Sequence, residues 1–397
     1  IGVTGGDRME RTVLGAASIE AKKFGVKTGM QIWEAKKLCP QIILVPGDSD
    51  KYLETTKRFL NILKDYTPYL EVFSIDECFL EVTGDRLQAT EIAKKIKKRI
   101  KTEIGEWITC SIGISYNKLL TKLAGSLQKP DGLVVIANQT EAIKVLDKIE
   151  LDEICGIGPR IKKRLNNMGV FNFYQLRQVP LKSLLASFKS YGQTLYNMAR
   201  GIDHSPVTPF YEKGEVKSIG HRHTIDHDTN DPAEIKQILL KLSEMVARRL
   251  RAKNLIGKTI HCWYREAFHP RFHLPGEFNG DSMQTTIPYT NDGLEIFKTA
   301  WRIFQSIWPA RNALACEAGG NMEKIRMVGI SISNLRPTLP QTLSLLPEAS
   351  KRETMLRVID TINDKYGEFT LQHGILLQSA SIKRKPNPFL SDKRFKI

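Results

Sequence analysis

Short hydrophobic runs alternate with longer amphipathic stretches over the first third of the chain. The runs at residues 1–3 and 108–114 have the β-branched composition of strands. Apolar positions recur at helical spacing in 49–66 and 92–104. Strands that alternate with helices in this way predict an α/β or α+β region, built around one sheet, over residues 1–136.

Three smaller features of this region carry expectations of their own. Residues 15–18, which follow a short strand at 12–14, have the small side chains of a bend, and 42–46 has the continuous apolar pattern of a buried strand. The lysines on the outer face of the 92–104 helix are typical of a solvated surface, which we favour over a binding surface.

The pattern changes at Asp152, where glycines and helical segments replace strands. Gly156 and Gly158 form a tight turn before a basic helix that carries Lys162 and Lys163. In a helix-hairpin-helix, such glycines let backbone N–H groups approach a phosphate at a helix N-terminus. We favour this DNA-contacting interpretation over an ordinary pair of helices. A weaker form of the same pattern follows at 188–193.

Residues 217–335 have the order β-α-β-β-α-β, which describes a small sheet with two helices on one face. A polar stretch with two prolines at 206–216 predicts a linker, and the basic segment 383–397 predicts a flexible tail. Trp301, Phe304 and Trp308 share one helical face and are expected in the core. Three histidines lie close together in the sequence, at His221, His223 and His227. No cysteine or carboxylate set completes a metal site at the usual spacing, so we expect no zinc site.

The amino-acid composition limits the classes of partner and the cellular compartment that we expect for this protein. The 397 residues include 59 Lys and Arg against 43 Asp and Glu, a formal net charge of +16 that favours a polyanion such as nucleic acid. We find no long apolar run that predicts a membrane span. The six cysteines are scattered without a CxxC motif, which indicates a reducing compartment and leads us to expect a soluble, cytoplasmic protein.

The chain is organised around residues 72–82, two short β runs joined by a tight turn. Asp76 and Glu77 lie where the second run begins. Carboxylates are rarely placed on an apolar strand unless they are paired or bind metal. Two adjacent acids fit Mg²⁺, which binds carboxylate and phosphate oxygens together, whereas the alternative is a surface Asp-Glu at a turn.

Five blocks of the sequence resemble, in the same order, motifs of the Y-family (translesion) DNA polymerases, nearest to DinB and UmuC-like members. The central block is SIDECFLEVTG at 74–84. The others are AASIEAKKFGVKTGM at 16–30, GISYNKLLTKLA at 113–124 with KPDG at 129–132, the glycine hairpin at 156–169, and KSIG at 217–220.

The resemblance implies a right-hand polymerase of α/β and α+β domains with template-dependent nucleotidyl transfer past damaged bases. It implies fingers over 1–53, palm over 54–138, a helix-hairpin-helix thumb over 139–205, the linker 206–216, a βαββαβ little finger over 217–382 and the tail 383–397. Primer–template DNA and deoxynucleoside triphosphates are the implied partners, and we expect a monomer. The segment 388–390 matches a clamp-binding motif poorly and does not decide whether a sliding clamp binds.

The resemblance also implies roles for individual residues. Asp76 would be a ligand of two Mg²⁺ ions, and Glu77 a ligand or catalytic acid at the primer end. Lys129 corresponds to a lysine that contacts the incoming triphosphate. Ser18, Ile19 and Lys22 lie in the fingers motif at the nucleotide. Ile19 replaces the usual tyrosine and Lys22 the usual arginine, so a hydroxyl and a bidentate fork are lost.

The family's first strand has no counterpart in residues 1–397. That strand carries another metal-binding Asp, aromatic residues at the nucleotide and the steric gate against ribonucleotides. We therefore expect Ile1 to be the start of a fragment and the chain as given to be inactive in nucleotide incorporation. The alternative is a non-catalytic DNA-binding accessory of a mutagenesis complex, which would not need Asp76 and Glu77.

Overall fold

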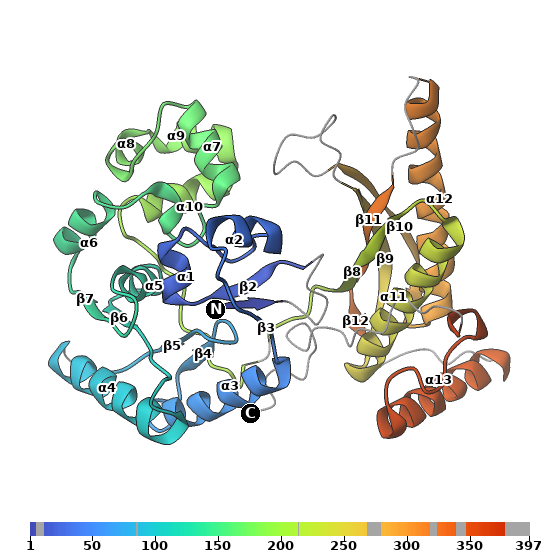
Figure 1. The fold of residues 1–397 in the computed structure, drawn as a ribbon, viewed down its shortest axis with the longest axis horizontal. Coiled ribbons are helices and arrows are strands. Elements are labelled where there is room, and N and C mark those ends of the chain that lie inside the picture. Colours follow the sequence, from blue (N-terminus) through green and yellow to red (C-terminus); the bar gives the residue numbers. More distant parts are fainter. Residues whose placement is uncertain are drawn as a thin grey trace. The chain divides into compact units, whose positions relative to one another are not determined.

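The computed structural model describes residues 1–4, 12–84, 86–212, 214–267, 279–317, 324–338 and 347–377. The chain divides into two compact units, Ile1–Gly47 with Gly214–Lys393 and Asp48–Lys213 with Arg394–Ile397. Figure 1 labels helices and strands of both. These divisions fall within a few residues of two domain borders expected from the sequence, at 53/54 and 216/217. The domain assignment itself stays a prediction.

The N-terminal segment is a three-stranded sheet with two helices. The strands are β1 (Gly2–Thr4), β2 (Leu14–Ala17) and β3 (Leu44–Pro46), in the order β2-β1-β3; the helices are α1 (Ile19–Lys23) and α2 (Ile32–Leu38). Strand β1 is antiparallel to β2 and parallel to β3. Six buried side chains form the core under α1 and α2: Leu14, Ala21, Val26, Ala35, Cys39 and Ile42.

Two expectations for this segment were wrong. Residues 15–17 are strand, not bend, because Ala16 and Ala17 pair with Val3 and Gly2 and sheet pairing overrides the low strand propensity of small residues. The buried strand expected at 42–46 is only Leu44–Pro46, and Val45 is 41 % exposed, because β3 is an edge strand of this sheet.

The first half of the second unit consists of two helices and the predicted hairpin. Helix α3 (Ser49–Lys64) begins after the capping side chain of Asp48, and α4 (Arg86–Arg99) continues into a π-helical turn, Ile100–Ile104. Strands β4 (Leu70–Val72) and β5 (Cys78–Leu80) pair antiparallel. A core common to these elements is built from Leu60, Ile62, Leu63, Leu70, Ile96 and Ile100.

The second half has a parallel strand pair covered by a helix. Strands β6 (Ile112–Ser115) and β7 (Leu133–Ile136) are joined by α5 (Lys118–Leu127), and α6 (Gln139–Leu146) follows. The expectation of one sheet over residues 1–136 was wrong. The described strands form separate small sheets, because β4 and β5 pair only with each other, as do β6 and β7.

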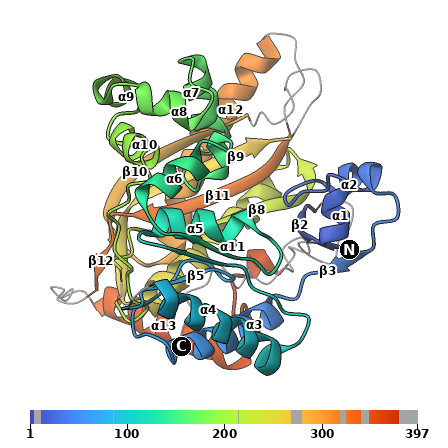
Figure 2. The ribbon, with the colours of Figure 1, turned by 90° about the vertical axis from the view of Figure 1, so that its left-hand side faces the viewer.

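Four short helices form the last part of this unit and cluster together (Figure 2): α7 (Pro159–Asn167), α8 (Phe173–Gln178), α9 (Leu181–Phe188) and α10 (Tyr191–Met198). A 3₁₀ turn, Leu151–Glu153, precedes them. Their buried residues belong to the same core as Leu120 and Leu123 of α5 and Ile136 of β7. The hairpin helices are therefore fixed to the helix that follows β6.

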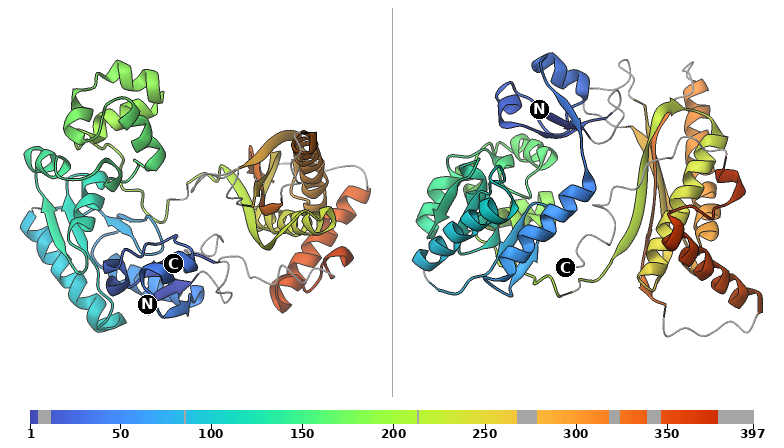
Figure 3. Two further views of the ribbon diagram at one scale, coloured as in Figure 1. Left: turned by 45° about the horizontal axis from the view of Figure 1, so that its top comes forward. Right: turned by 60° about the horizontal axis from the view of Figure 1, so that its bottom comes forward.

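The segment from Gly214 confirms the predicted β-α-β-β-α-β order. Its elements are β8 (Ser218–Thr229), α11 (Pro232–Ala252), β9 (Leu255–Glu266), β10 (Gly280–Thr290), α12 (Gly293–Glu317) and β11 (Ile325–Ser333). The antiparallel sheet has the order β10-β9-β11-β8, with β12 (Arg336–Pro337) beside β9. Figure 3 shows α11 and α12 on one side of it. As expected, Phe304 and Trp308 are buried in this core, and Trp301 packs against it while partly buried.

Helix α13 (Pro347–Tyr366) and a 3₁₀ turn, Gly374–Leu376, extend this domain. Arg251 of α11 binds both carboxylate oxygens of Asp360, at 2.6 and 2.8 Å, and Arg248 pairs with Asp364 and Glu368. The tail predicted at 383–397 lies outside the described residues. In the part of the chain that the structure describes, no helix is long and apolar enough to span a membrane.

Candidate active site

The hairpin β4–β5 presents Asp76 and Glu77 at its turn. Backbone N–H groups of Phe73 and Ser74 donate to the Glu77 carbonyl at 3.0 and 2.9 Å and close the turn. Phe73 packs edge-on against Phe79 with ring centroids 5.4 Å apart. The two carboxylates therefore project from a turn whose backbone is fixed on both sides.

Two hydroxyl groups hold the turn further. Thr56 of α3 donates from Oγ1 to the Ile75 carbonyl at 2.6 Å, and Ser74 donates from Oγ to Asp76 Oδ1, also at 2.6 Å. Thr56 is buried, whereas Asp76 is exposed. Ser74 therefore orients Asp76, and the exposed side chain has a second carboxylate oxygen outside this hydrogen bond.

Two lysines one turn apart on α5 bind the hairpin. Lys122 Nζ lies 2.7 Å from Glu77 Oε2 and 4.6 Å from the centre of the Phe73 ring. Lys118 Nζ lies 2.6 Å from Glu71 Oε2, with both side chains 17 % exposed, and 5.2 Å from the Phe79 ring centre. Because residues four apart share one helix face, α5 fixes the hairpin at two points.

The donor set suits a hard divalent cation. Asp76 and Glu77 supply carboxylate oxygens, and burial raises the pKa of the neighbouring Cys78 thiol to about 12, so the thiol is protonated at neutral pH and is no ligand. In the described ranges, no group of three or more His, Cys, Asp and Glu side chains could hold a metal ion. Mg²⁺ is commonly bound by one or two carboxylates together with substrate phosphates, and this pair fits that pattern.

Lys129 lies in the loop between α5 and β7, within the same unit as the carboxylates. Its side chain is exposed, and among the described residues it has no hydrogen-bond or ion-pair partner. The loop follows directly from the helix that carries Lys122. Helix α5 thus connects the loop of Lys129 to Lys122, which pairs with the predicted site residue Glu77.

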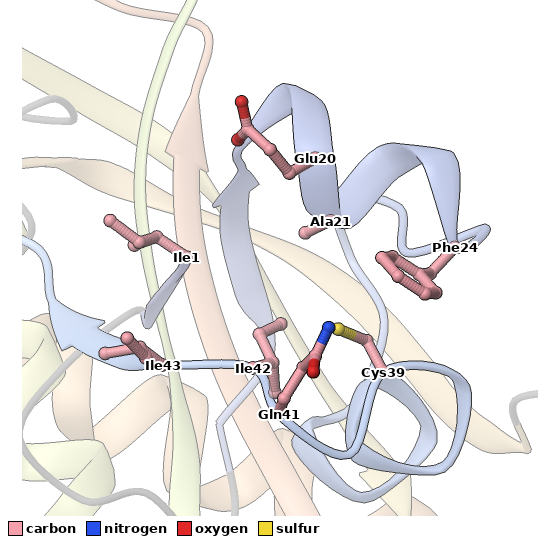
Figure 4. A pocket seen from close by; sticks show the side chains of 8 residues that line it. All are labelled: Ile1, Glu20, Ala21, Phe24, Cys39, Gln41, Ile42 and Ile43. Atoms are coloured by element: carbon pink, nitrogen blue, oxygen red, sulfur yellow. The ribbon is translucent and has the colours of Figure 1, made fainter.

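Ser18, Ile19 and Lys22 lie on or next to α1, in the other unit. Ser18 caps α1, its Oγ accepting from the Ala21 N–H at 3.3 Å, while Ile19 and Lys22 are exposed. A cavity of about 350 Å³ adjoins this helix (Figure 4), lined by Ile1, Glu20, Ala21, Phe24, Cys39, Gln41, Ile42 and Ile43. None of the three predicted nucleotide-contacting residues lines it, so this cavity is not the predicted nucleotide site.

The glycine turn before α7 has the geometry of a phosphate-binding hairpin at one of its two glycines. Gly158 is the N-cap of α7, and a Cβ there would meet nothing within 4 Å. Gly156 has φ +111°, and its Cβ would lie 2.7 Å from Met198 Cε and 2.9 Å from Tyr191 Oη. Gly156 thus shapes the turn, whereas the Gly158 end of the helix is open to a ligand.

The two hairpin lysines differ in their surroundings. Lys162 Nζ pairs with Asp152 Oδ1 at 2.7 Å and Glu150 Oε2 at 3.0 Å. Hydrogen bonding to Asp152, and then to Glu150, raises the pKa of Lys162 and keeps it cationic. Lys163 is exposed, with no partner in the described part of the chain. Two acidic neighbours thus compensate the charge of Lys162, whereas the charge of Lys163 is uncompensated among the described residues.

Sequence reasoning missed Lys118, Lys122, Ser74 and Thr56. A signal for the two lysines was present, because Lys118 and Lys122 are four residues apart on a helix whose other positions are mostly apolar. No local signal identifies Thr56, whose acceptor is 19 residues away.

Three family models match this chain over most of its length. The impB/mucB/samB family matches residues 1–126, and the C-terminal domain of the same family matches 216–345. Residues 152–203, which contain the glycine turn and α7–α10, match the thumb domain of DNA polymerase-iota.

Individual relatives match along nearly the whole chain. DNA polymerase IV of Moorella thermoacetica is 34% identical over 385 residues, 96% of this chain and 90% of that protein. DNA polymerase IV of Pelotomaculum thermopropionicum is 34% identical over 388 residues, with the same coverage.

Solved structures are similar to this chain over most of its length. The Y-family DNA polymerase chimera Dbh-Dpo4(243-245)-Dbh matches with a TM-score of 0.67 at 26% identity, over 84% of this chain and 91% of the chimera. The insertion ternary complex of Dbh DNA polymerase matches with a TM-score of 0.50, at the same identity and coverage. The chain therefore belongs to the Y-family, the translesion-type DNA-directed DNA polymerases.

Proposed function

We propose that Asp76 and Glu77 are the metal-binding carboxylates of template-directed nucleotidyl transfer, with Mg²⁺ as the ion and two ions per site. The geometry of the turn supports this, since it presents both acids on a fixed backbone with one Asp76 oxygen outside the Ser74 hydrogen bond. The ions, when bound, stabilise the charge on the attacking and leaving oxygens of an in-line displacement. Asp76 and Glu77 supply the ligands, and Ser74 orients Asp76.

Lys122 has a role in this proposal as the counter-ion of Glu77 when no metal is bound. Its ammonium lies 2.7 Å from Oε2, so a cation that uses this oxygen must displace it. The pair is partly exposed, with side-chain exposures of 26 % and 43 %, which permits the exchange. Glu77 is thereby held in place before the ion arrives.

We expect Mn²⁺, as a spectroscopic substitute for Mg²⁺, to report on this exchange. Asp76→Asn and Glu77→Gln should each weaken Mn²⁺ binding, because each removes a charged ligand. Lys122→Met should strengthen it by about threefold, since an exposed ion pair that competes with the metal is worth roughly 0.2–1 kcal/mol. Electron paramagnetic resonance titration of the free chain measures all three.

The control is Lys148→Met, which removes one exposed positive charge in the same unit. A change in Lys148→Met equal to that in Lys122→Met would mean that net charge alone is responsible. Unchanged Mn²⁺ affinity in both Asp76→Asn and Glu77→Gln would contradict the metal site.

For the nucleotide, we propose that Lys129 contacts the triphosphate and that Ser18, Ile19 and Lys22 form the fingers side of the site. Lys129 is an exposed cation with its charge uncompensated among the described residues, which suits a phosphate. Lys22 supplies a single point charge, and Ile19 supplies only apolar contact. We therefore expect weaker triphosphate binding than in relatives that have arginine and tyrosine there.

For DNA, we propose that primer–template duplex binds the glycine turn through the backbone at Gly158, with Lys163 and, to a smaller extent, Lys162 beside it. Helix N-termini bind phosphate through free N–H groups and the helix dipole. These contacts position the duplex without reading its sequence, and the net charge of +16 adds a salt-dependent attraction. The relatives are named as DNA polymerases, which favours the proposed nucleotidyl transfer over the alternative of a non-catalytic DNA-binding accessory.

Gly158→Val should weaken DNA binding about tenfold and lower stability only slightly, because Val is a poorer N-cap residue than Gly. The added side chain meets open space in the free protein but blocks the approach of a phosphate, and one lost hydrogen bond to a charged group is of this size. Fluorescence anisotropy with a labelled primer–template at several salt concentrations measures the affinity, and thermal unfolding measures the stability.

Gly156→Val is the informative comparison. Its positive φ and its contacts with Met198 and Tyr191 predict a loss of stability as well as of DNA binding. Wild-type affinity in Gly158→Val, or affinity that does not depend on salt, would exclude the glycine turn as a phosphate contact.

A further inference from the structure

Lys97 of α4 is the most enclosed of the lysines in the helix whose outer face was interpreted as solvated. Its side chain is 17 % exposed. The ammonium donates to the carbonyls of Cys110 and Asp131, both at 2.7 Å, and to Asp131 Oδ1 at 2.6 Å; the Gly132 carbonyl lies at 3.3 Å. Three N–H donors and four nearby acceptors leave this ammonium no capacity for an external ligand.

All but one of these acceptors belong to the loop that carries Lys129. Lys101, one turn further along the helix, binds the second Asp131 oxygen at 3.0 Å. Hydrogen bonds from Lys97, and then from Lys101, lower the pKa of Asp131, so this carboxylate stays ionised at neutral pH. Lys97 and Lys101, on one face of the helix, thus both bind Asp131, which lies two positions after Lys129.

The loop backbone needs such support. Asp131 has φ +58°, a left-handed conformation that non-glycine residues adopt at a cost. Gly132 folds back so tightly that a Cβ there would lie 1.9 Å from the Gln128 carbonyl oxygen. The Gly132 N–H donates to Ser111 Oγ at 3.2 Å, and its carbonyl accepts from the Ile112 N–H at 3.0 Å. Ser111 Oγ also donates to the Gln128 carbonyl at 3.4 Å, so the loop is held just before and just after Lys129.

We propose that Lys97 is a positioning residue for nucleotide binding: it fixes the 128–132 loop so that Lys129 is presented to the triphosphate in one conformation. A preformed loop spares the incoming nucleotide the cost of ordering it. Lys97 touches neither substrate nor metal and acts through Lys129. The inference rests on the proposed contact between Lys129 and the triphosphate.

The test is the affinity of the correct deoxynucleoside triphosphate for the complex of the chain with primer–template DNA. A dideoxy-terminated primer prevents incorporation, and a 2-aminopurine base in the template reports binding. Lys97→Met should weaken nucleotide binding about tenfold, the effect of having to order the loop on binding. DNA affinity should not change. The matched control is Lys98→Met, the next residue on the same helix, which is exposed and should bind nucleotide like the wild type.

A double-mutant cycle separates positioning from general damage. If Lys97 acts through Lys129, then Lys97→Met has no further effect in a Lys129→Ala background. An equal loss in both backgrounds would overturn the inference, as would wild-type nucleotide affinity in Lys97→Met. Wild-type affinity in Lys129→Ala would instead refute the proposed triphosphate contact.

A second variant guards against poor folding of Lys97→Met. Asp131→Asn keeps a residue that tolerates the left-handed conformation and an acceptor for Lys97, but it removes the ion pair with both lysines. It should weaken nucleotide binding in the same direction and by less. Wild-type affinity in Asp131→Asn, together with an unfolded Lys97→Met, would also count against the inference.

Discussion

Asp76→Ala and Glu77→Ala should each lower metal-dependent primer extension by about 10²–10³-fold or more, the range seen when one preorganised electrostatic group is removed from an active site. Both carboxylates project from the turn of the β4–β5 hairpin, and this turn is held by Thr56 and by its own backbone. Each substitution removes charge at the proposed metal site but leaves the Thr56 contact and the backbone hydrogen bonds of the turn in place. Both substitutions are made in a version of the enzyme that extends primers before substitution. Primer extension and DNA affinity are then measured in parallel.

DNA affinity should stay within about twofold of the wild type in both variants, since the phosphate-binding groups proposed here lie elsewhere. Glu81→Ala is the control, because Glu81 is an exposed carboxylate just after the same strand. It should extend primers normally. Normal extension by either Asp76→Ala or Glu77→Ala would show that this pair is not the metal site.

Gly113→Ala should lower the free energy of unfolding by about 3 kcal/mol, at the upper end of what overpacking a core costs. A Cβ on Gly113 would lie 2.1 Å from the Thr121 carbonyl oxygen and 2.4 Å from the Gly125 N–H nitrogen. These are backbone atoms of α5, so the helix must move away from β6. Urea denaturation, followed by circular dichroism, measures the loss.

The same variant should also disturb the site, because α5 carries Lys118 and Lys122. Gly158→Ala is the matched control for stability in this unit, since its Cβ meets open space. Equal unfolding midpoints for Gly113→Ala and Gly158→Ala would mean that the contact between α5 and β6 is looser than the structure indicates.

The hairpin, the glycine turn and the βαββαβ domain could be predicted from the sequence because their signals are local. Asp76 and Glu77 stand out against the apolar residues on both sides of them in the sequence, and the glycines before α7 lie beside the helix that they begin. The strand at 15–17 could not be predicted in this way. Small residues there favour a bend, and only pairing with β1 makes them a strand.

The contacts of the lysines mark the other limit of sequence reasoning. Lys97 and Lys98 are neighbours with the same chemistry, yet Lys97 is partly buried and bonded to a loop 34 residues away, whereas Lys98 is exposed. The helical pattern indicates which face is apolar, but not which lysine at its margin meets a partner distant in sequence. The sequence likewise places Lys122 on a helix. Its pairing with Glu77 cannot be inferred from the sequence, because it depends on how α5 packs against the hairpin.

Helix α5 places Lys122 and the start of the Lys129 loop on one rigid rod. From Lys122 to the last residue, Leu127, it rises about 7.5 Å, at 1.5 Å per residue. One extra residue in this interval would rotate the loop by about 100° relative to Lys122. The helix thus acts as a spacer that sets the separation between the carboxylate end of the site and the proposed phosphate contact. We therefore expect an insertion or deletion within α5 to disturb the site more than a substitution at an exposed position of the helix such as Ser126.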